Sequence, residues 1–329
     1  MEHQQTGELN NDFRTCLSHL MENGLTANPR GTVTKELLNY NISLLDARNR
    51  VITFPDRKTN LKYLLGEFVW YLTGANTVNG ILPYSKFWAN ITNSGDFEEI
   101  GYAAGTINSN YGYRLFGHDE FSDVPGKRDE TGTIQWLSQW EAVIDLLSRD
   151  KDSRQAILNI HRPSDRHPGN SDVPCTLSLQ VLIRENKLHM ITNMRSNDIV
   201  LGFTNDVFQF TMLQECLMVQ LKDVYPELEL GTYFHNAGSM HAYDRHFAMA
   251  AAIIADENAV EKSMIPMDEF NLGVVEKLAF IEQLWVHHGM PAAFDFAQVP
   301  SFNELSPYWQ NLVKFCFSSD PAAELAIFK

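Results

Sequence analysis

The sequence predicts an α+β fold built as one continuous domain. Segments with strand-like and helix-like patterns fall into groups along the chain, instead of alternating strictly as in parallel α/β proteins. No stretch rich in proline and serine separates two halves of the 329 residues. Hydrophobic residues make up 44% and charged residues 20% of the chain, which is typical of a globular protein and too apolar for a disordered one.

The first third of the chain predicts a helix, a strand and a second helix. Residues 8–24 carry apolar side chains at helical spacing and end on a glycine. Residues 28–46 begin as a loop and then alternate apolar with polar side chains, which indicates a strand. Residues 59–73 are strongly apolar and predict a helix, with Thr59 as the N-cap and Gly74 at its end.

The middle of the chain predicts an irregular region, then a helix and a short strand. Residues 89–130 are rich in glycine, asparagine and aspartate and contain few periodic stretches, so we expect an irregular excursion there. Residues 133–150 are amphipathic at helical spacing. Residues 155–163 predict a short buried strand, which Pro163 ends.

The remaining chain predicts a hairpin followed by helices. Two apolar strands, at residues 175–183 and 188–196, flank a short polar turn. Residues 206–222 and 238–254 have helical patterns, with a strand and a loop between them. Residues 274–329 mix helical segments with a stretch rich in proline and phenylalanine.

Charge and cysteine content exclude several classes of protein. The 26 basic and 41 acidic residues give a net charge of −15, which repels nucleic acid, so an anionic small molecule would need locally grouped arginines. The four cysteines lie far apart, which indicates a reducing compartment and argues against a cysteine zinc site. The first residues are polar, and the longest apolar run is far shorter than the roughly 20 residues that span a bilayer. We therefore expect a soluble cytoplasmic protein without a membrane partner.

Common cofactor and metal motifs are missing from the sequence. It contains no phosphate-binding G-x-x-x-x-G-K loop, no G-x-G-x-x-G and no H-E-x-x-H. The histidine groupings are the pair His287–His288 and the spaced His235, His241 and His246. Because no carboxylate or thiolate completes a ligand set around them, metal binding is not predicted.

Cys175 is a candidate nucleophile because of its neighbours in the predicted hairpin. A lone cysteine is most often a small buried apolar residue. Here Arg195, Ser196 and Asp198 lie on the returning strand. A cation beside a thiol stabilises the thiolate, which is the nucleophilic form. Arginine and serine side chains can also bind a phosphate.

Seven collinear motifs give the sequence a family resemblance. The runs PCTLSLQ, MRSNDIVLGFTNDVFQF and HNAGSMHAYDRH resemble the core of the thymidylate synthase family, which includes the deoxycytidylate hydroxymethylases. NPRGT, EFVWYLTG, NYGYRLFG and DSRQAIL also agree with the family, in order, within residues 28–246. The resemblance implies a thymidylate synthase fold, with a large mixed sheet packed against helices and one sheet face as a homodimer interface. Residues 1–329 would form one such domain, with a divergent C-terminal segment from about residue 262.

The resemblance also implies a reaction and a set of site residues. Cys175 would add to position 6 of a pyrimidine, and position 5 would then accept a one-carbon unit from 5,10-methylenetetrahydrofolate. Glu67 would orient water and relay protons near the base. The implied contacts are Arg30, Arg195, Ser196 and a partner-subunit Arg154 at the 5′-phosphate, His241 and Tyr243 at the sugar, Asp198 at the folate pterin, and Trp88 and Tyr111 around the base and folate.

The main departure from the methylating synthases is the residue that reads the base. Those synthases have P-F-N after L-G-x, whereas this chain has Thr204, Asn205 and Asp206 after L-G-F. One carboxamide satisfies the N3–H donor and O4 acceptor of uracil, whereas a carboxyl can accept from N4 of cytosine and share a proton with its N3. Asp206 therefore favours cytosine, as in the deoxycytidylate hydroxymethylases. If the alignment slips by one residue, Asn205 is the reader instead.

Further departures leave the product and the sugar open. Thr176 replaces the histidine that usually follows the nucleophile, and Gln155 replaces one of two adjacent phosphate arginines. The tail, which ends in AELAIFK, does not resemble the closing segment that seals the site of the synthases, so we expect a site that admits water, consistent with a hydroxymethyl product. We therefore expect a deoxycytidylate 5-hydroxymethyltransferase, with Ser196 favouring deoxyribose.

Four alternatives stay open. Three are enzymes, namely a CMP 5-hydroxymethylase, a dCMP 5-methyltransferase, and a thymidylate synthase or dUMP hydroxymethylase. The fourth belongs to another class and is a non-catalytic nucleotide- or RNA-binding relative. The presence of Cys175 and Glu67 argues against a non-catalytic protein.

Overall fold

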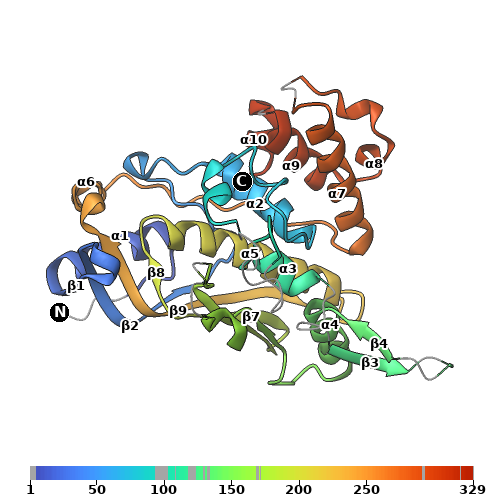
Figure 1. Ribbon diagram of the computed structural model, residues 1–329, viewed down its shortest axis with the longest axis horizontal. Coiled ribbons are helices and arrows are strands. Elements are labelled where there is room, and N and C mark those ends of the chain that lie inside the picture. The colour runs from blue at the N-terminus through green and yellow to red at the C-terminus, as the bar shows by residue number, and fades with distance from the viewer. Residues whose placement is uncertain are drawn as a thin grey trace.

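A mixed β-sheet forms the base of the molecule, and most of the helices lie on one side of it (Figure 1). The computed structural model describes residues 5–92, 103–107, 109–117, 124–128, 130–131, 134–167, 170, 172–290, 293–318 and 320–328. The strands of the sheet are β1 (Leu25–Ala27), β2 (Thr34–Leu44), β5 (Ile157–Asn159), β6 (Thr176–Arg184), β7 (Lys187–Met194), β8 (Asn197–Asp198) and β9 (Glu229–Tyr243). A separate antiparallel pair consists of β3 (Val124–Arg128) and β4 (Ile134–Leu137).

The strand order is β1-β2-β9-β7-β6-β5, and β8 also pairs with β9. The long strand β9 runs parallel to β7 and β8, and every other neighbouring pair in this sheet is antiparallel. Along β6, β7 and β9, buried residues alternate with partly exposed ones. One face of the sheet is therefore covered by helices, and the other is only partly buried in the single chain.

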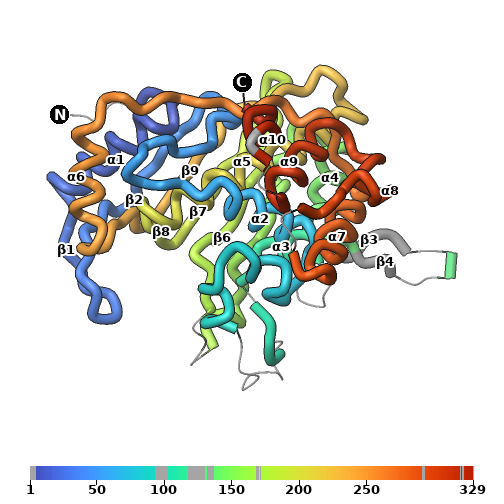
Figure 2. The backbone as a smooth tube through the Cα atoms, turned by 90° about the horizontal axis from the view of Figure 1, so that it is seen from above, coloured from blue at the N-terminus to red at the C-terminus, as the bar shows by residue number. Residues whose placement is uncertain are grey.

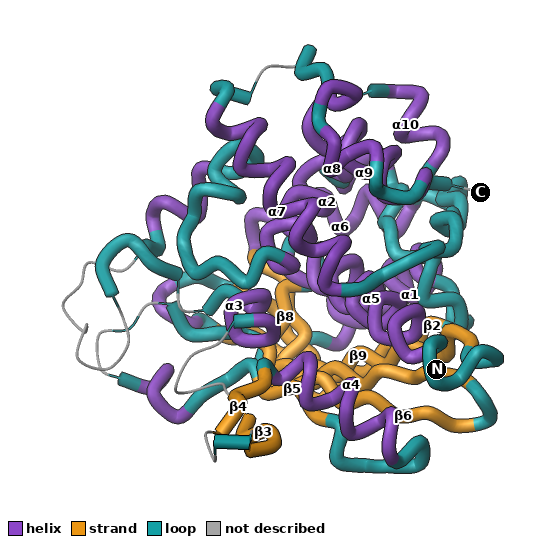
Figure 3. Tube along the Cα trace, turned by 90° about the vertical axis from the view of Figure 1, so that its right-hand side faces the viewer, coloured by secondary structure: helices purple, strands orange, loops and turns teal. Residues whose placement is uncertain are grey.

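The helices are α1 (Leu9–Asn23), α2 (Leu61–Leu72), α3 (Tyr111–Phe116), α4 (Gln139–Arg149), α5 (Gly202–Leu221), α6 (Phe247–Ala255), α7 (Leu272–His287), α8 (Pro300–Asn303), α9 (Pro307–Ser318) and α10 (Pro321–Ala326). Helices α1 and α5 pack on the sheet, and α2 packs on α5. Helices α7 to α10 form the layer farthest from the sheet (Figures 1 and 3). Seen from above, they gather at the opposite end of the molecule from α1 and α6 (Figure 2). Among the described residues, no helix has the length and apolar character needed to cross a bilayer.

The structure confirms the predicted α+β class, the first helix and the hairpin. In that hairpin, Glu185 and Asn186 have φ angles of 50° and 58°, as the two central residues of a tight primed turn require. The segment 155–163 forms a strand only over β5, and Ile157 there is 40% exposed, so the strand is buried on one face alone. Helix α5 begins four residues before the predicted start at residue 206.

Three helix predictions need correction. Asn60, not Thr59, caps α2, because its side chain accepts a hydrogen bond from the backbone N–H of Tyr63. The helix predicted over 133–150 begins only at Gln139, the first residue of α4. The residues before it form β4, and Ser138 then caps the helix in a capping box. The predicted helix 238–254 is wrong in its first part, because β9 continues to Tyr243, paired with β2.

The predicted irregular region 89–130 lies partly outside the described residues. Its described part contains the short helix α3 and the strand β3, so the expectation of an irregular chain is wrong for these two segments. Asn110 starts α3, since its side chain accepts from the backbone N–H of Gly112.

A buried ion cluster ties the C-terminal part of the chain to α5. Glu215 is fully buried and accepts hydrogen bonds from Arg48 at 2.7 Å, Arg50 at 2.6 Å and the backbone N–H of Met267 at 3.0 Å. Burial alone would raise the pKa of Glu215, but the Arg50 and Arg48 guanidiniums outweigh it and hold the pKa below its usual value. The cluster therefore stabilises the fold at neutral pH, and this contribution is lost as the pH falls through the folded-state pKa.

We expect Glu215→Ala to lower the free energy of unfolding by about 3–5 kcal/mol, because it leaves the buried Arg50 charge without a partner. Urea unfolding followed by circular dichroism measures the change. The control is Asp145→Ala, which removes the exposed Asp145–Arg149 ion pair and should cost less than about 1 kcal/mol. Equal, small losses in both variants would contradict a stabilising role for the cluster.

Candidate active site

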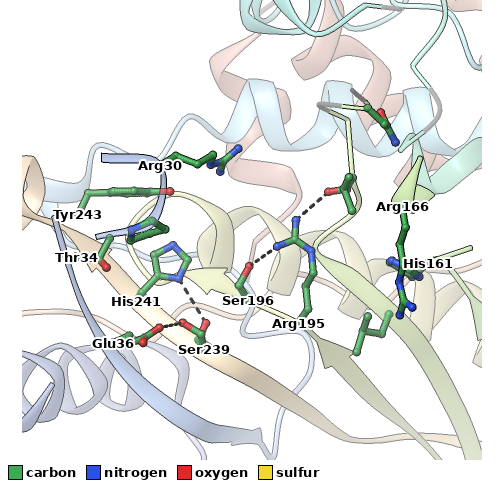
Figure 4. Close-up of a pocket in the computed structure, with 14 residues that line it drawn as sticks. Arg30, Thr34, Glu36, His161, Arg166, Arg195, Ser196, Ser239, His241 and Tyr243 are labelled. Carbon is green, nitrogen blue, oxygen red and sulfur yellow. Dashed lines mark hydrogen bonds between the residues drawn. The ribbon is translucent and has the colours of Figure 1, made fainter. Parts of the chain in front are cut away.

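A cavity of about 650 Å³ opens where β2, β9 and the end of β7 meet the loop before β6 (Figure 4). Its volume suits a small-molecule ligand of nucleotide size. The ionisable side chains that line it are Arg30, Glu36, His161, Arg166, Arg195, His241 and Tyr243. Three arginines and one carboxylate make this a locally basic site in a chain of net charge −15, which fits an anionic ligand.

Arg195 is held in place by the residues that precede Cys175. Its guanidinium donates to the carbonyls of Pro174 and Val173, both at 3.0 Å, and to the Ser196 hydroxyl at 3.2 Å. The backbone N–H of Arg195 also donates to the carbonyl of Cys175, at 2.8 Å. The predicted phosphate ligand and the predicted nucleophile are therefore joined directly.

Cys175 is half-buried, and its sulfur accepts a hydrogen bond from the Ser196 hydroxyl at an O···S distance of 3.9 Å. Burial raises the pKa of the thiol, Asp206 adds to this, and Arg195, Ser196 and Arg30 oppose it. The sequence predicts a stabilised thiolate, and the arginines do act in that direction. The net shift is nevertheless upward, so in the ligand-free chain the thiol is mainly protonated at neutral pH.

Arg30 reaches the cavity from a strained turn. It has a φ angle of 52° and is followed by Gly31 at 81°, both in the left-handed region. A non-glycine residue seldom adopts this conformation without a structural or functional reason. In Figure 4, Arg30 lies on one side of Arg195, and His161 and Arg166 lie on the other.

Glu67 lies on α2, only 4% exposed, and is bound on both oxygens. Tyr63 donates to one oxygen at 2.7 Å, and Gln209 on α5 donates to the other at 3.0 Å. Burial raises the pKa of Glu67 to about 8, although these two hydrogen bonds lower it. The indole N–H of Trp88 donates to the Tyr63 hydroxyl at 3.2 Å, so Trp88 and Glu67 are linked through Tyr63.

Asp206 lies in the first turns of α5. Its Oδ2 accepts a hydrogen bond from the Asn197 amide at 2.7 Å. Burial raises the pKa of Asp206 to about 7, and the bond from Asn197 opposes the shift. The Asp206 carboxylate in turn helps to raise the pKa values of Cys175, Glu67 and Tyr111. The four predicted residues thus converge, and two carboxyl groups with pKa values near neutrality can act as acid or base.

Tyr111 and Asp198 support the site in different ways. The Tyr111 ring stacks on Phe210 of α5 with a centroid distance of 5.8 Å, next to Tyr71. Asp198 accepts hydrogen bonds from the backbone N–H groups of Val200 and Leu201 and so stabilises the turn before α5.

Five predicted contacts line the cavity, namely Arg30, Arg195, Ser196, His241 and Tyr243. Cys175 adjoins them through Ser196. Arg154 is exposed and is not among the lining residues of its own chain, and its carbonyl accepts a hydrogen bond from Gln180 on β6.

Several residues of the site were not predicted from the sequence. His161, Arg166, Glu36 and Ser239 line the cavity, and Tyr63 and Gln209 bind Glu67. The basic run HRPSDRH just before Cys175 indicates local positive charge and could have suggested Arg166. Among the described residues, no group of three or more His, Cys, Asp or Glu side chains could hold a metal ion.

A family model described as thymidylate synthase matches residues 11–277, which include every residue of the site. The chain belongs to the thymidylate synthase family. It is therefore an enzyme that transfers a one-carbon unit to a pyrimidine nucleotide, with methylenetetrahydrofolate as co-substrate.

Curated members of the thymidylate synthase family that resemble this chain differ in activity. The deoxycytidylate 5-hydroxymethyltransferase of Enterobacteria phage T4 is 31% identical over 195 residues, which cover 57% of this chain and 69% of the relative. The deoxyuridylate hydroxymethyltransferase of Bacillus phage SP01 is 28% identical over an alignment that covers 70% of this chain and 56% of the relative. The thymidylate synthase of Bacillus licheniformis is 26% identical over an alignment that covers 73% of this chain and 69% of the relative.

The three-dimensional comparison confirms the thymidylate synthase fold. The thermostable thymidylate synthase A of Bacillus subtilis superposes with a TM-score of 0.60 at 20% sequence identity, covering 78% of this chain and 87% of that structure. The last 52 residues of this chain, 278–329, lie beyond the family match and include α8, α9 and α10.

Proposed function

We propose that the chain is a deoxycytidylate 5-hydroxymethyltransferase, which transfers the one-carbon unit of 5,10-methylenetetrahydrofolate to C5 of dCMP. The observation that carries the proposal is Asp206, at the position where the methylating synthases have asparagine. Its pKa of about 7 leaves a large neutral fraction at physiological pH. A neutral carboxyl can accept from the N4 amino group of cytosine with one oxygen and donate to N3 with the other.

The same carboxyl disfavours uracil. An ionised Asp206 would oppose O4 of uracil with a second acceptor in a site largely removed from water, at a cost of about 1–3 kcal/mol. The phage T4 relative, named for deoxycytidylate, agrees with this reading. The SP01 relative, named for deoxyuridylate, makes dUMP the competing substrate to test.

The remaining groups fit the steps that this reaction needs. The Cys175 thiol gives up its proton and its sulfur adds to C6 across the C5=C6 double bond, and proton sharing from Asp206 to N3 favours that attack. C5 then bonds to the one-carbon unit, and loss of the C5 hydrogen and of the sulfur restores the double bond. Arg30, Arg195 and Ser196 hold the 5′-phosphate, and His241 and Tyr243 contact the sugar. Glu67, with its pKa of about 8, holds and transfers protons at the water that supplies the new hydroxyl oxygen.

The folate co-substrate has a matching surface in the chain. The half-buried Trp88 indole lies beside Tyr63 and Glu67 and offers a flat ring next to the proposed reacting groups. The Asp198 carboxylate provides an acceptor for the amino group of a pterin.

Mass spectrometry of the products from dCMP, CMP and dUMP, each supplied with methylenetetrahydrofolate, tests the proposed function. We expect 5-hydroxymethyl-dCMP as the main product. Preference for CMP would move the assignment to a ribonucleotide enzyme, a methylated product would identify a methyltransferase, and preferred turnover of dUMP would overturn the cytosine assignment. No product and no hydrogen exchange at C5 from any of them would support a non-catalytic relative.

We further propose that the enzyme is a homodimer in which Arg154 acts on the partner's phosphate site. The uncovered sheet face carries Leu182, Ile191 and Phe234, each partly exposed, and Ile191 and Phe234 are paired neighbours. The Gln180 side chain on the same face reaches the Arg154 carbonyl, so Arg154 lies beside it. A second copy on this face would bury these apolar side chains and bring Arg154 toward a neighbouring cavity.

We expect Cys175→Ala and Arg154→Ala chains to be inactive alone and to recover activity when mixed, since a heterodimer contains one site without either change. Turnover of dCMP in exchanged mixtures measures the recovery. Native mass spectrometry is the control that heterodimers have formed. No recovery in fully exchanged heterodimers would contradict the shared site.

A further inference from the structure

A continuous chain of hydrogen bonds runs from the centre of the sheet to Asp206. The Tyr233 hydroxyl lies 2.8 Å from Nδ1 of His235, and Nε2 of His235 lies 2.9 Å from Oδ1 of Asn197. The amide of Asn197 then donates to Oδ2 of Asp206 at 2.7 Å. Tyr233 and His235 are fully buried and Asn197 is 3% exposed, so water does not compete with the bonds among these three residues, whereas Asp206 itself is only partly buried.

The chain has one consistent direction of donation. Asn197 turns its NH₂ group to Asp206 and its oxygen to His235, which is also the orientation that an ionised Asp206 requires, because a carboxylate only accepts. His235 must then carry its proton on Nε2, and its Nδ1 accepts from the Tyr233 hydroxyl. Burial lowers the pKa of His235 to about 3, so the ring stays neutral and can hold this single tautomer.

The neighbouring residues leave this arrangement little freedom. Phe203 packs its ring against the His235 ring at 5.0 Å between centroids, with the two planes nearly perpendicular. The first residue of α5 is Gly202, where a Cβ atom would lie 2.8 Å from the Asn197 amide nitrogen and 3.5 Å from Oδ2 of Asp206. Only glycine lets the helix begin so close to the bond.

We propose that His235 is a positioning residue for the carboxyl that reads the base: by holding the Asn197 amide in one orientation, it keeps Oδ2 of Asp206 an acceptor and confines the proton of the neutral carboxyl to Oδ1. Oδ2 retains a second lone pair for the N4 amino group of cytosine, while Oδ1 donates to N3. The identity of the base rests on the proposed function, whereas the placement of the proton rests on the hydrogen-bond chain alone.

Other titratable groups surround Asp206 and belong to the same electrostatic environment. They are Tyr63, Glu67 and Tyr71 on α2, Tyr111 on α3, Cys175 before β6, and Tyr233 on β9. Substitutions at His235 leave each of these groups in place. A change in the pKa of Asp206 would therefore report the loss of the hydrogen-bond chain.

The kinetic test compares His235→Leu with His235→Gln. Leucine removes the donor to Asn197, whereas glutamine can place an amide N–H near the position of Nε2. We expect His235→Leu to lower kcat for dCMP by about ten- to a hundredfold with little change in KM, and to lower the dCMP/dUMP ratio of kcat/KM, because buried donors and acceptors are then mismatched. The His235→Gln variant should recover most of the kcat for dCMP and most of the dCMP/dUMP ratio. Equal losses in both variants with an unchanged dCMP/dUMP ratio would overturn the proposal.

The second test needs no substrate. Titration of the Asp206 carboxyl by ¹³C NMR in the ligand-free protein should give a higher pKa in His235→Leu than in the parent chain, because the Asn197 bond lowers that pKa. Nitrogen NMR of the His235 ring should show the proton on Nε2 between about pH 5 and pH 9. A proton on Nδ1, or an unchanged Asp206 titration in a folded variant, would overturn the proposal.

Tyr233→Phe keeps the test available if His235→Leu does not fold. It removes only the hydroxyl at the far end of the chain, and we expect a smaller upward shift of the Asp206 pKa in the same direction. No shift in that variant would count against the proposal. If the products identify a uracil enzyme while the NMR results are as expected, the positioning role of His235 stands and the cytosine assignment alone fails.

Discussion

Replacement of Cys175 by alanine is expected to abolish both turnover and hydrogen exchange at C5, while nucleotide affinity stays within about tenfold, or 1.4 kcal/mol. In the proposed reaction the sulfur supplies the bond to C6, and nothing else among the described residues beside that position offers a comparable nucleophile. The cavity proposed to hold phosphate and sugar is lined by other side chains, with Arg30, Arg195 and His241 among them. Tritium release from C5-labelled dCMP measures the exchange, and calorimetric titration with dCMP measures the affinity.

The matched control for this change is Cys316→Ala. Cys316 is fully buried in α9, beyond the residues that the family model matches, and its sulfur lies 3.0 Å from the Tyr84 hydroxyl. We expect this variant to retain exchange, with some loss of stability. Full activity in Cys175→Ala would remove the nucleophile assignment.

The second large effect is expected at the base reader. Asp206→Asn should move the ratio of specificity constants from dCMP toward dUMP by roughly ten- to a thousandfold, since one hydrogen bond changes from matched to opposed. The carboxamide donates to O4 of uracil and accepts from its N3–H. Most of the loss should appear in kcat for dCMP, because proton sharing with N3 also activates the ring. Steady-state kinetics with both nucleotides measure the ratio.

Asn205→Ala is the control for this prediction, because it changes the neighbouring residue that a shifted alignment would choose. We expect this variant to change the ratio of kcat/KM for dCMP and dUMP only slightly. If Asn205 controlled the choice between dCMP and dUMP, the register would be wrong by one residue and the cytosine assignment would lose its main support.

Periodic apolar patterns predicted the elements whose surroundings match their local preference. The hairpin of β6 and β7 alternates because one face is buried, and α1 and α5 present apolar side chains where they pack. The end of β9 is different. A small apolar residue such as Ala242 suits a helix equally well, and only the pairing of this part of β9 with β2 and β8 makes it a strand.

The site was predictable only as far as its motifs reach. Cys175, Arg195 and Ser196 were candidates from their neighbours in the predicted hairpin, whereas most other assignments came from the family resemblance. Gln209 is a single polar residue within an apolar run, and His235 lies next to another polar residue, Asn236; neither position has a periodic signal. Their roles depend on hydrogen bonds between α5 and α2 or between β9 and β8, which tertiary structure alone creates.

The hydrogen bonds of Arg195 have a consequence for the thermodynamics of substrate binding. Three of its five N–H donors are used within the described chain, so one hydrogen on each terminal nitrogen remains for a phosphate oxygen. An arginine side chain carries about 2 kcal/mol of rotamer entropy, and here much of it is lost when the protein folds. A nucleotide bound as proposed therefore meets a preorganised guanidinium and does not bear the entropic cost of ordering it.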